Sequence, residues 1–343
     1  MYLLEVNDLH TYFRTRKGIV KAVNGVSFGI EEGKTLGIVG ESGSGKSISA
    51  MSILRLLDDN GYIAKGEIFF TENGKREDLA KLPLEKMYEI RGNRISVIFQ
   101  EPMTALNPVL TIGRQLAEPF LIHENMSKKQ ALAEAEKMLN EVRIPNPKRV
   151  MKSYAHQLSG GMRQRVMIAM ALACRPKMII ADEPTTALDV TIQAQILRLM
   201  KGLQQEKGTA ILFISHDLGV IKEMADDIAV TYCGQIVEYT SAERLFDEQN
   251  PYNHPYTEGL LLSVPSGERG KARLESIAGS VPHPLQVPKG CRFAPRCKYC
   301  TQKCIEEEPP LVERGDGRIR CFYPEKEQRR GKEHGKLVVD CSS

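Results

Sequence analysis

The octapeptide Gly40-Glu41-Ser42-Gly43-Ser44-Gly45-Lys46-Ser47 decides the fold expected for this chain. It matches the pattern G-x-x-x-x-G-K-[ST]. An apolar run at residues 35–39, typical of a buried parallel strand, comes directly before it, and a run with helical spacing at residues 48–57 follows. Glycines let the backbone wrap so that successive N–H groups point inward, and the helix N-terminus adds positive potential. The stretch therefore predicts a phosphate-binding loop in an α/β protein.

Each side chain in this loop has an expected task. Lys46 is predicted to reach the β- and γ-phosphates of a nucleotide, and the Ser47 hydroxyl to ligate Mg²⁺. The alternative is a glycine-rich turn without a ligand, but Lys-Ser in this register serves no packing need. The remaining cradle is assigned to Gly40, Ser42, Gly43, Ser44 and Gly45.

A second apolar strand, expected at residues 178–182, ends in the pair Asp182-Glu183. In a parallel sheet the carboxyl ends of the strands share one edge, so we expect this pair beside the phosphate loop. Asp182 is predicted to hold Mg²⁺, and Glu183 to polarise an attacking water. The alternative is that Asp-Glu before proline only starts a turn and caps the next helix.

The chain divides into three kinds of sequence. Strands alternate with helices in residues 1–100 and 160–250, which predicts a core with a mainly parallel sheet. Residues 101–159 are helical in pattern, with Ser127 as an expected N-cap, and indicate an inserted subdomain. Residues 251–343 are rich in proline, glycine and cysteine and form a small C-terminal extension.

Composition narrows the classes of function. The chain has 343 residues, of which 42% are hydrophobic and 26% charged, as in globular proteins. A net charge of +4 with interleaved acids gives no support for nucleic-acid binding. The longest apolar run, at residues 166–174, is far shorter than the roughly 20 residues that span a bilayer, and no secretory signal begins the chain. We expect a cytosolic protein that docks on a separate membrane protein.

The stretch Leu158-Ser159-Gly160-Gly161-Met162-Arg163-Gln164-Arg165 resembles the signature motif of the ABC (ATP-binding cassette) ATPases. Physically it is another anion site, because backbone N–H groups gather at a helix start beside a hydroxyl. The resemblance implies a RecA-like P-loop core and a head-to-tail pair of ATPase subunits. Each subunit would offer its signature to the ATP of the other through Ser159, Gly160, Gly161 and Gln164. Met162 replaces the glutamine common in the family.

The same resemblance implies roles for lesser features. Gln100 would sense Mg²⁺ and the attacking water, His216 would contact the γ-phosphate, and Asp189 would communicate across the dimer. A lone His after a strand is more often structural, and a lone Asp before a helix is more often a cap. The adenine is expected to stack on Phe13, with Tyr12 as the neighbour that could serve instead.

The C-terminal third is similar to bacterial dipeptide and oligopeptide importer ATPases, on the stretches at residues 250–257 and 290–297 and on QEPMTALNP from Gln100. This implies ATP-driven peptide import at the cytoplasmic face of the cell membrane. The partners would be two transmembrane permease subunits, a second ABC ATPase subunit and an extracytoplasmic peptide-binding protein. Nickel importers share much of the pattern. Two more distant alternatives are a soluble ABC ATPase and a redox-sensing module that binds ATP without useful hydrolysis.

Five of the eight cysteines fall between Cys291 and Cys321, which favours a metal or cluster site over disulfides in a reducing compartment. The resemblance implies a [4Fe-4S] cluster on four of them. Cys300 lies outside that set, and Cys297-x-x-Cys300 has zinc-knuckle spacing, which leaves zinc open. Free or disulfide-bonded thiols are the third possibility. The cluster ligands would be Cys291, Cys297, Cys304 and Cys321.

Overall fold

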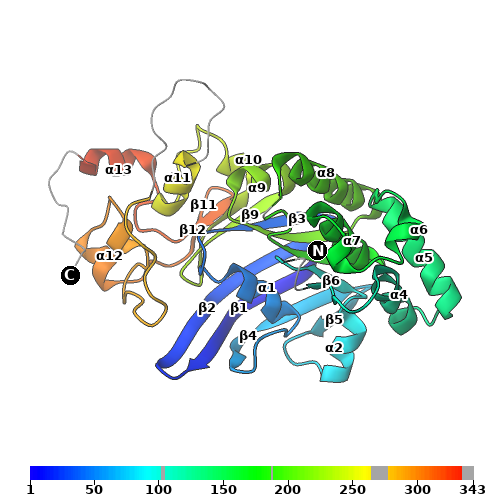
Figure 1. The fold of residues 1–343 in the computed structure, drawn as a ribbon. Helices are drawn as coiled ribbons and strands as arrows, with labels where there is room; N and C mark the ends of the chain where they lie inside the picture. The colour runs from blue at the N-terminus through cyan, green and yellow to red at the C-terminus, as the bar shows by residue number, and fades with distance from the viewer. Residues whose placement is uncertain (102–104, 187, 264–276, 334–343) are drawn as a thin grey trace. The chain divides into compact units, whose positions relative to one another are not determined.

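The computed structural model describes residues 1–101, 105–186, 188–263 and 277–333 (Figure 1). The chain forms two compact units. The first holds residues 1–4, 30–35 and 70–214, and the second holds residues 5–29, 36–69 and the chain from residue 215 onward. This division cuts across the three parts expected from the sequence, so the boundaries of core, helical subdomain and extension remain a prediction.

The parallel strands of the first unit are β6 (Ile95–Ile98), β7 (Met178–Asp182) and β8 (Ala210–Ser215). β6 pairs with β7, and β7 pairs with β8, both in parallel. The parallel pairing expected for the core strands is therefore confirmed for these three strands. Every residue of β7 and β8 is buried, as in sheets covered on both faces. Helices α7 (Gly160–Leu172) and α8 (Val190–Lys207) follow in the alternation and meet the sheet around a small apolar cavity.

A helical cluster joins this sheet at α7. Helix α4 (Ile112–His123) packs against α5 (Lys128–Glu141), and both contact α7. Ser127 caps α5, as predicted, in a capping box with Gln130. The smaller elements of this unit are β5 (Lys75–Asp78), α2 (Leu84–Ile90), α6 (Pro147–Val150) and the 3₁₀ turn Ala155–Gln157.

The second unit carries strand β3 (Thr35–Val39), which runs parallel to β9 (Asp227–Tyr232). The pairing then turns antiparallel, which the expectation of a mainly parallel sheet did not include. Cys233 and Gly234 between β9 and β10 (Gln235–Ser241) have φ of 45° and 78°, the pair of positive values that a two-residue hairpin needs. The C-terminal part adds β12 (Gly317–Ile319) to β10 and β11 (Val312–Arg314) to β12, both antiparallel.

Strands β2 (Gly18–Glu31), β1 (Tyr2–Thr15) and β4 (Gly61–Glu72) are neighbours in that order in another sheet.

None of the helices that the structure describes is long and apolar enough to cross a membrane. The helices of the second unit are α1 (Lys46–Ile53), α9 (Leu218–Met224), α10 (Ala242–Leu245), α11 (Pro255–Leu262), α12 (Gln302–Glu306) and α13 (Lys326–Glu333), with a 3₁₀ turn at Ala294–Arg296.

The loop before α4 depends on one buried side chain, Gln115, which is 3% exposed. Its amide donates to the carbonyls of Asn107 and Leu110, each at 3.0 Å, and accepts from the Asn107 N–H at 2.8 Å.

Gln115→Leu keeps the size and the helix propensity but leaves three backbone groups without partners. We predict a loss of about 2 kcal/mol in the free energy of unfolding, measured by urea denaturation. The exposed Gln205→Leu on α8 should change it by less than about 0.5 kcal/mol, and equal effects would contradict this role.

Candidate functional site

The predicted phosphate loop lies between the end of β3 at Val39 and the start of α1 at Lys46, as the sequence required. Two of its glycines, Gly40 and Gly45, lie so close to other backbone that a side chain would not fit. A Cβ on Gly40 would lie 2.2 Å from the Thr231 carbonyl oxygen, and one on Gly45 would lie 2.5 Å from that of Ala22. Gly45 also has a φ of 96°. The loop can therefore take this shape only with glycine at both positions.

Lys46 is turned into the loop and is 5% exposed. Its ammonium donates to the carbonyl oxygens of Gly40 at 2.8 Å and Glu41 at 3.0 Å. The Lys46 ammonium is therefore fixed against the first turn of the loop. An anion bound in the loop would contact both this ammonium and the N-terminus of α1. Ser42 and Gly43 are exposed, and Ser47 is half-buried at the helix start.

The β9–β10 hairpin holds the middle of the loop. The Ser44 hydroxyl is 3.1 Å from that of Thr231, and the Ser44 carbonyl accepts from the Gly234 N–H at 2.8 Å. Thr231 in turn donates to the Val39 carbonyl at 3.1 Å. The shape of the loop is thus tied to strands that begin almost 200 residues later in the chain.

In the first unit, the structure brings two of the three predicted catalytic residues together. Asp182 ends β7 and is 5% exposed, and Glu183 follows with a φ of 45°, a backbone strain often stored at functional sites. Gln100 donates to Glu183 Oε2 at 3.2 Å, and the Thr186 hydroxyl donates to the same oxygen at 2.9 Å. Thr186 had not been expected, because a threonine in a turn carries no spacing signal of its own.

The signature stretch begins helix α7 as predicted. Ser159 is the N-cap and accepts from the Met162 N–H, and both Ser159 and Gly160 are exposed. Gly161 packs against Ile192 of α8, since a Cβ there would lie 3.0 Å from its methyl group. Gln164 is 2% exposed and its amide donates to the Pro184 carbonyl, next to Glu183. The contact of Gln164 with a partner's ATP stays a prediction.

Asp189 and His216 both lie at the starts of helices. The Asp189 carboxylate accepts from the Ile192 N–H at 2.9 Å and caps α8, so the capping alternative is realised, and the side chain is exposed. His216 follows β8 and is also exposed. Their predicted roles need a second subunit or a nucleotide and remain predictions.

The two candidate adenine platforms lie side by side near the end of β1. The Tyr12 hydroxyl donates to Asn24 at 3.0 Å. Phe13 packs on the backbone of Gly61, where a Cβ would lie 2.7 Å from its ring. Thr11 bonds Ser52 of α1 at 2.8 Å, and alternation along a strand places Phe13 on that same face and Tyr12 on the other.

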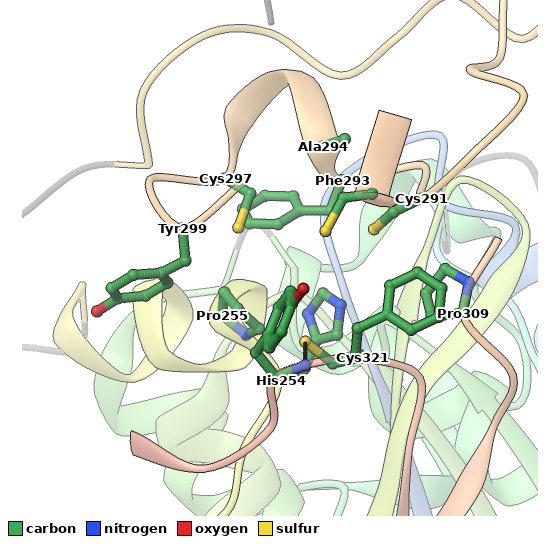
Figure 2. Close-up of a pocket in the computed structure, with 12 residues that line it drawn as sticks. His254, Pro255, Cys291, Phe293, Ala294, Cys297, Tyr299, Pro309 and Cys321 are labelled. Carbon is green, nitrogen blue, oxygen red and sulfur yellow. Dashed lines mark hydrogen bonds between the residues drawn. The ribbon is translucent and has the colours of Figure 1, made fainter. Parts of the chain in front are cut away.

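The cysteine pocket lies within the second unit and is lined by Cys291, Cys297, Cys304 and Cys321 among aromatic side chains (Figure 2). These are the four cysteines of the predicted ligand set. Cys300 does not line it, and its thiol contacts the Thr301 carbonyl at 3.7 Å. None of the seven cysteines in the described part of the chain forms a disulfide. Among the same residues, no three His, Cys, Asp or Glu side chains converge closely enough to hold a metal ion.

Burial governs the chemistry of these thiols. It raises the pKa of Cys291 to about 12 and that of Cys321 to about 11, and it raises the pKa of Cys297 as well. The neighbouring thiols add to each shift, because each thiolate would repel the next. A buried group of thiolates therefore needs a positive charge among them, such as that of a metal centre. Without one, the thiols of Cys291, Cys297 and Cys321 stay protonated at neutral pH.

Two family models match the chain. The model described as "ABC transporter" matches residues 23–186, and the one described as "Oligopeptide/dipeptide transporter, C-terminal region" matches residues 237–304. The first range includes the phosphate loop, the signature stretch and Glu183. The second includes Cys291, Cys297 and Cys304.

Similar proteins and structures agree with these matches. The oligopeptide transport ATP-binding protein AppD of Bacillus subtilis is 52% identical over 95% of this chain and 98% of its own length. The oligopeptide transport ATP-binding protein OppD of Salmonella typhimurium is 48% identical over 95% of each chain. The dimeric post-hydrolysis structure of the ATP-binding cassette MJ0796, bound to ADP and Pi, is 28% identical with a TM-score of 0.62, over 70% of this chain and 98% of that one. The chain therefore belongs to the ABC transporter ATP-binding protein family, with the cassette fold of an ABC ATPase and the C-terminal region of the oligopeptide and dipeptide transporters.

Proposed function

We propose that this ATPase powers an importer of dipeptides and oligopeptides from the cytoplasmic face of the cell membrane. The observation that carries the proposal is the likeness to oligopeptide transport ATP-binding proteins over nearly the whole of both chains, extension included. Nickel importers, which share much of the sequence pattern, are the second candidate for cargo.

ATP binding is assigned to the phosphate loop. Lys46 would hold the β- and γ-phosphates, with the loop N–H groups around them, and Ser47, Gln100 and Asp182 would supply the oxygen ligands of Mg²⁺. Two observations support this assignment. The Lys46 ammonium is turned into the loop, and Gly40 lies against the Thr231 carbonyl where no side chain would fit. For the adenine, the shared strand face of Thr11 and Phe13 supports Phe13 over Tyr12.

Hydrolysis is assigned to Glu183 as the group that polarises water, with Gln100 and His216 beside the γ-phosphate. Gln100 and Thr186 both donate to Oε2 of Glu183, which holds that oxygen in place. A general base must be held in this way before it can take a proton from a positioned water. Thr186 is therefore added to the set as an orienting residue.

The partners follow from the exposed signature. Ser159, Gly160 and Gly161 would meet the ATP of a second ABC ATPase, and Asp189 would report across that interface. The dimeric arrangement named for the MJ0796 cassette supports such a pair. Closure would move the helical region against two permease subunits, and an extracytoplasmic peptide-binding protein would deliver the cargo.

Substituting Glu183→Gln tests the assignment of the base. The amide keeps the size and the bond from Gln100 but cannot accept a proton, so kcat for phosphate release should fall by about 10²- to 10³-fold. The Kd for MgATP should stay within about threefold of wild type. The control is Glu206→Gln on the exposed side of α8, which should leave kcat unchanged. Retained turnover in the Glu183 variant would remove this residue as the base.

For the cysteine pocket we propose a [4Fe-4S] cluster, with zinc as the alternative, and either would have to draw together thiols that do not converge on a metal ion in this structure. The thiols of Cys291, Cys297, Cys304 and Cys321 would hold it, matching the ligand count of four. The Cys300 thiol does not line the pocket and contacts the Thr301 carbonyl instead, which supports a set without the zinc-knuckle pair. Bound there, a cluster would supply the positive charge that the buried thiolates need.

Colour and iron content test this proposal. Protein purified without oxygen should be brown, absorb broadly near roughly 400 nm and carry about four irons per chain. Cys304→Ser should lose iron and colour, whereas Cys174→Ser, a buried cysteine outside the pocket, should keep both. A colourless protein with one tightly held zinc per chain would decide against the cluster.

A further inference from the structure

The C-terminal extension reaches the phosphate loop at Glu41, within the second unit. Arg296 ends a 3₁₀ turn directly before Cys297. Its guanidinium donates to both carboxylate oxygens of Glu41, with Nη1 2.5 Å from Oε2 and Nη2 3.0 Å from Oε1. The side chain of Arg296 is 4% exposed and that of Glu41 28% exposed. This is the two-pronged arginine–carboxylate geometry that gives the strongest charge-assisted hydrogen bonds.

The main chain of Glu41 is held at the same time. The Tyr256 hydroxyl, fully buried, accepts from the Glu41 N–H at 2.8 Å. The Glu41 carbonyl accepts from the Lys46 ammonium at 3.0 Å. A continuous chain of contacts therefore runs from Arg296 through Glu41 to Lys46.

Arg296 is itself firmly anchored. It donates to the Ala278 carbonyl at 2.9 Å, and its guanidinium lies 5.8 Å from the centre of the Tyr232 ring. A second arginine of the same segment, Arg292, donates to the carbonyl of Cys233, in the turn that bonds Ser44. The segment from Cys291 to Cys297 thus contacts the phosphate loop directly at Glu41 and also holds the β9–β10 turn that bonds the loop at Ser44.

The charges have a consequence for an anionic ligand. A carboxylate at the second position of a polyphosphate-binding loop repels the phosphates unless it is neutralised. Arg296 supplies that neutralisation from a position where little water screens it. Packing of the extension alone does not require a paired charge at the loop, since an apolar contact would serve it as well.

We propose that Arg296 is a positioning residue for ATP, which neutralises and orients Glu41 and, through the Glu41 carbonyl, sets the place of Lys46. The inference rests on the proposed assignment of ATP to this loop. It gives the C-terminal extension a direct part in nucleotide affinity, in addition to carrying the cysteine pocket.

The test is the affinity of the full chain for the non-hydrolysable analogue AMP-PNP with Mg²⁺, measured by calorimetry. Arg296→Met should weaken binding about tenfold, because it leaves the Glu41 charge unpaired and loosens Lys46. Arg296→Lys should recover part of the loss. The double variant Glu41→Gln with Arg296→Met should return to within about threefold of wild type, since the repelling charge is gone.

A matched control separates electrostatics from packing. Arg244 also ties the extension down, through Asp316 and the Arg314 carbonyl at 2.7 Å, and these contacts do not involve the loop. Arg244→Met should bind AMP-PNP as wild type does. Wild-type affinity in Arg296→Met, or a loss shared by Arg244→Met and not recovered in the double variant, would overturn the inference. No binding even by the wild-type chain would instead remove the assignment of ATP to the loop.

Discussion

One backbone contact constrains the predicted phosphate loop: the approach of Gly40 to the Thr231 carbonyl, too close for any side chain. Because Thr231 belongs to β9, which pairs in parallel with β3, the shape of the loop depends on that strand pairing. The hydroxyls of Ser44 and Thr231 and the N–H of Gly234 then complete the shape. Lys46, turned back on the first carbonyls of the loop, is a consequence of that shape.

The position of Glu183, the predicted catalytic base, depends on how strand β7 ends. Glu183 leaves the strand with a positive φ, and its carboxylate is held by Gln100 from the end of β6 and by Thr186 from the following turn. Gln164 of the signature helix donates to the next carbonyl, that of Pro184. The signature helix and the turn that carries Glu183 are therefore in direct contact. A shift of either would be felt by the other.

Local signals carried much of the prediction. The strand-to-helix loop at residues 40–47, the helix start after Ser159 and the buried strand ending at Asp182 each have a short-range pattern, and each lies where that pattern predicts it. The antiparallel edge was missed because apolar alternation indicates a strand but not the direction of its partner. The Arg296–Glu41 pair joins residues 255 positions apart, and no periodicity links such a pair. The four cysteines were chosen by resemblance, and they do line one pocket.

The central claim is that ATP held at this loop drives peptide uptake. Its most direct test is tripeptide uptake by the purified transporter complex in proteoliposomes that carry either the wild-type chain or Lys46→Met. We expect ATP-dependent uptake of the peptide with the wild-type chain and none with the variant, which removes the phosphate-binding cation. Peptide uptake that survives Lys46→Met, or transport of nickel ions in place of the peptide, would contradict it.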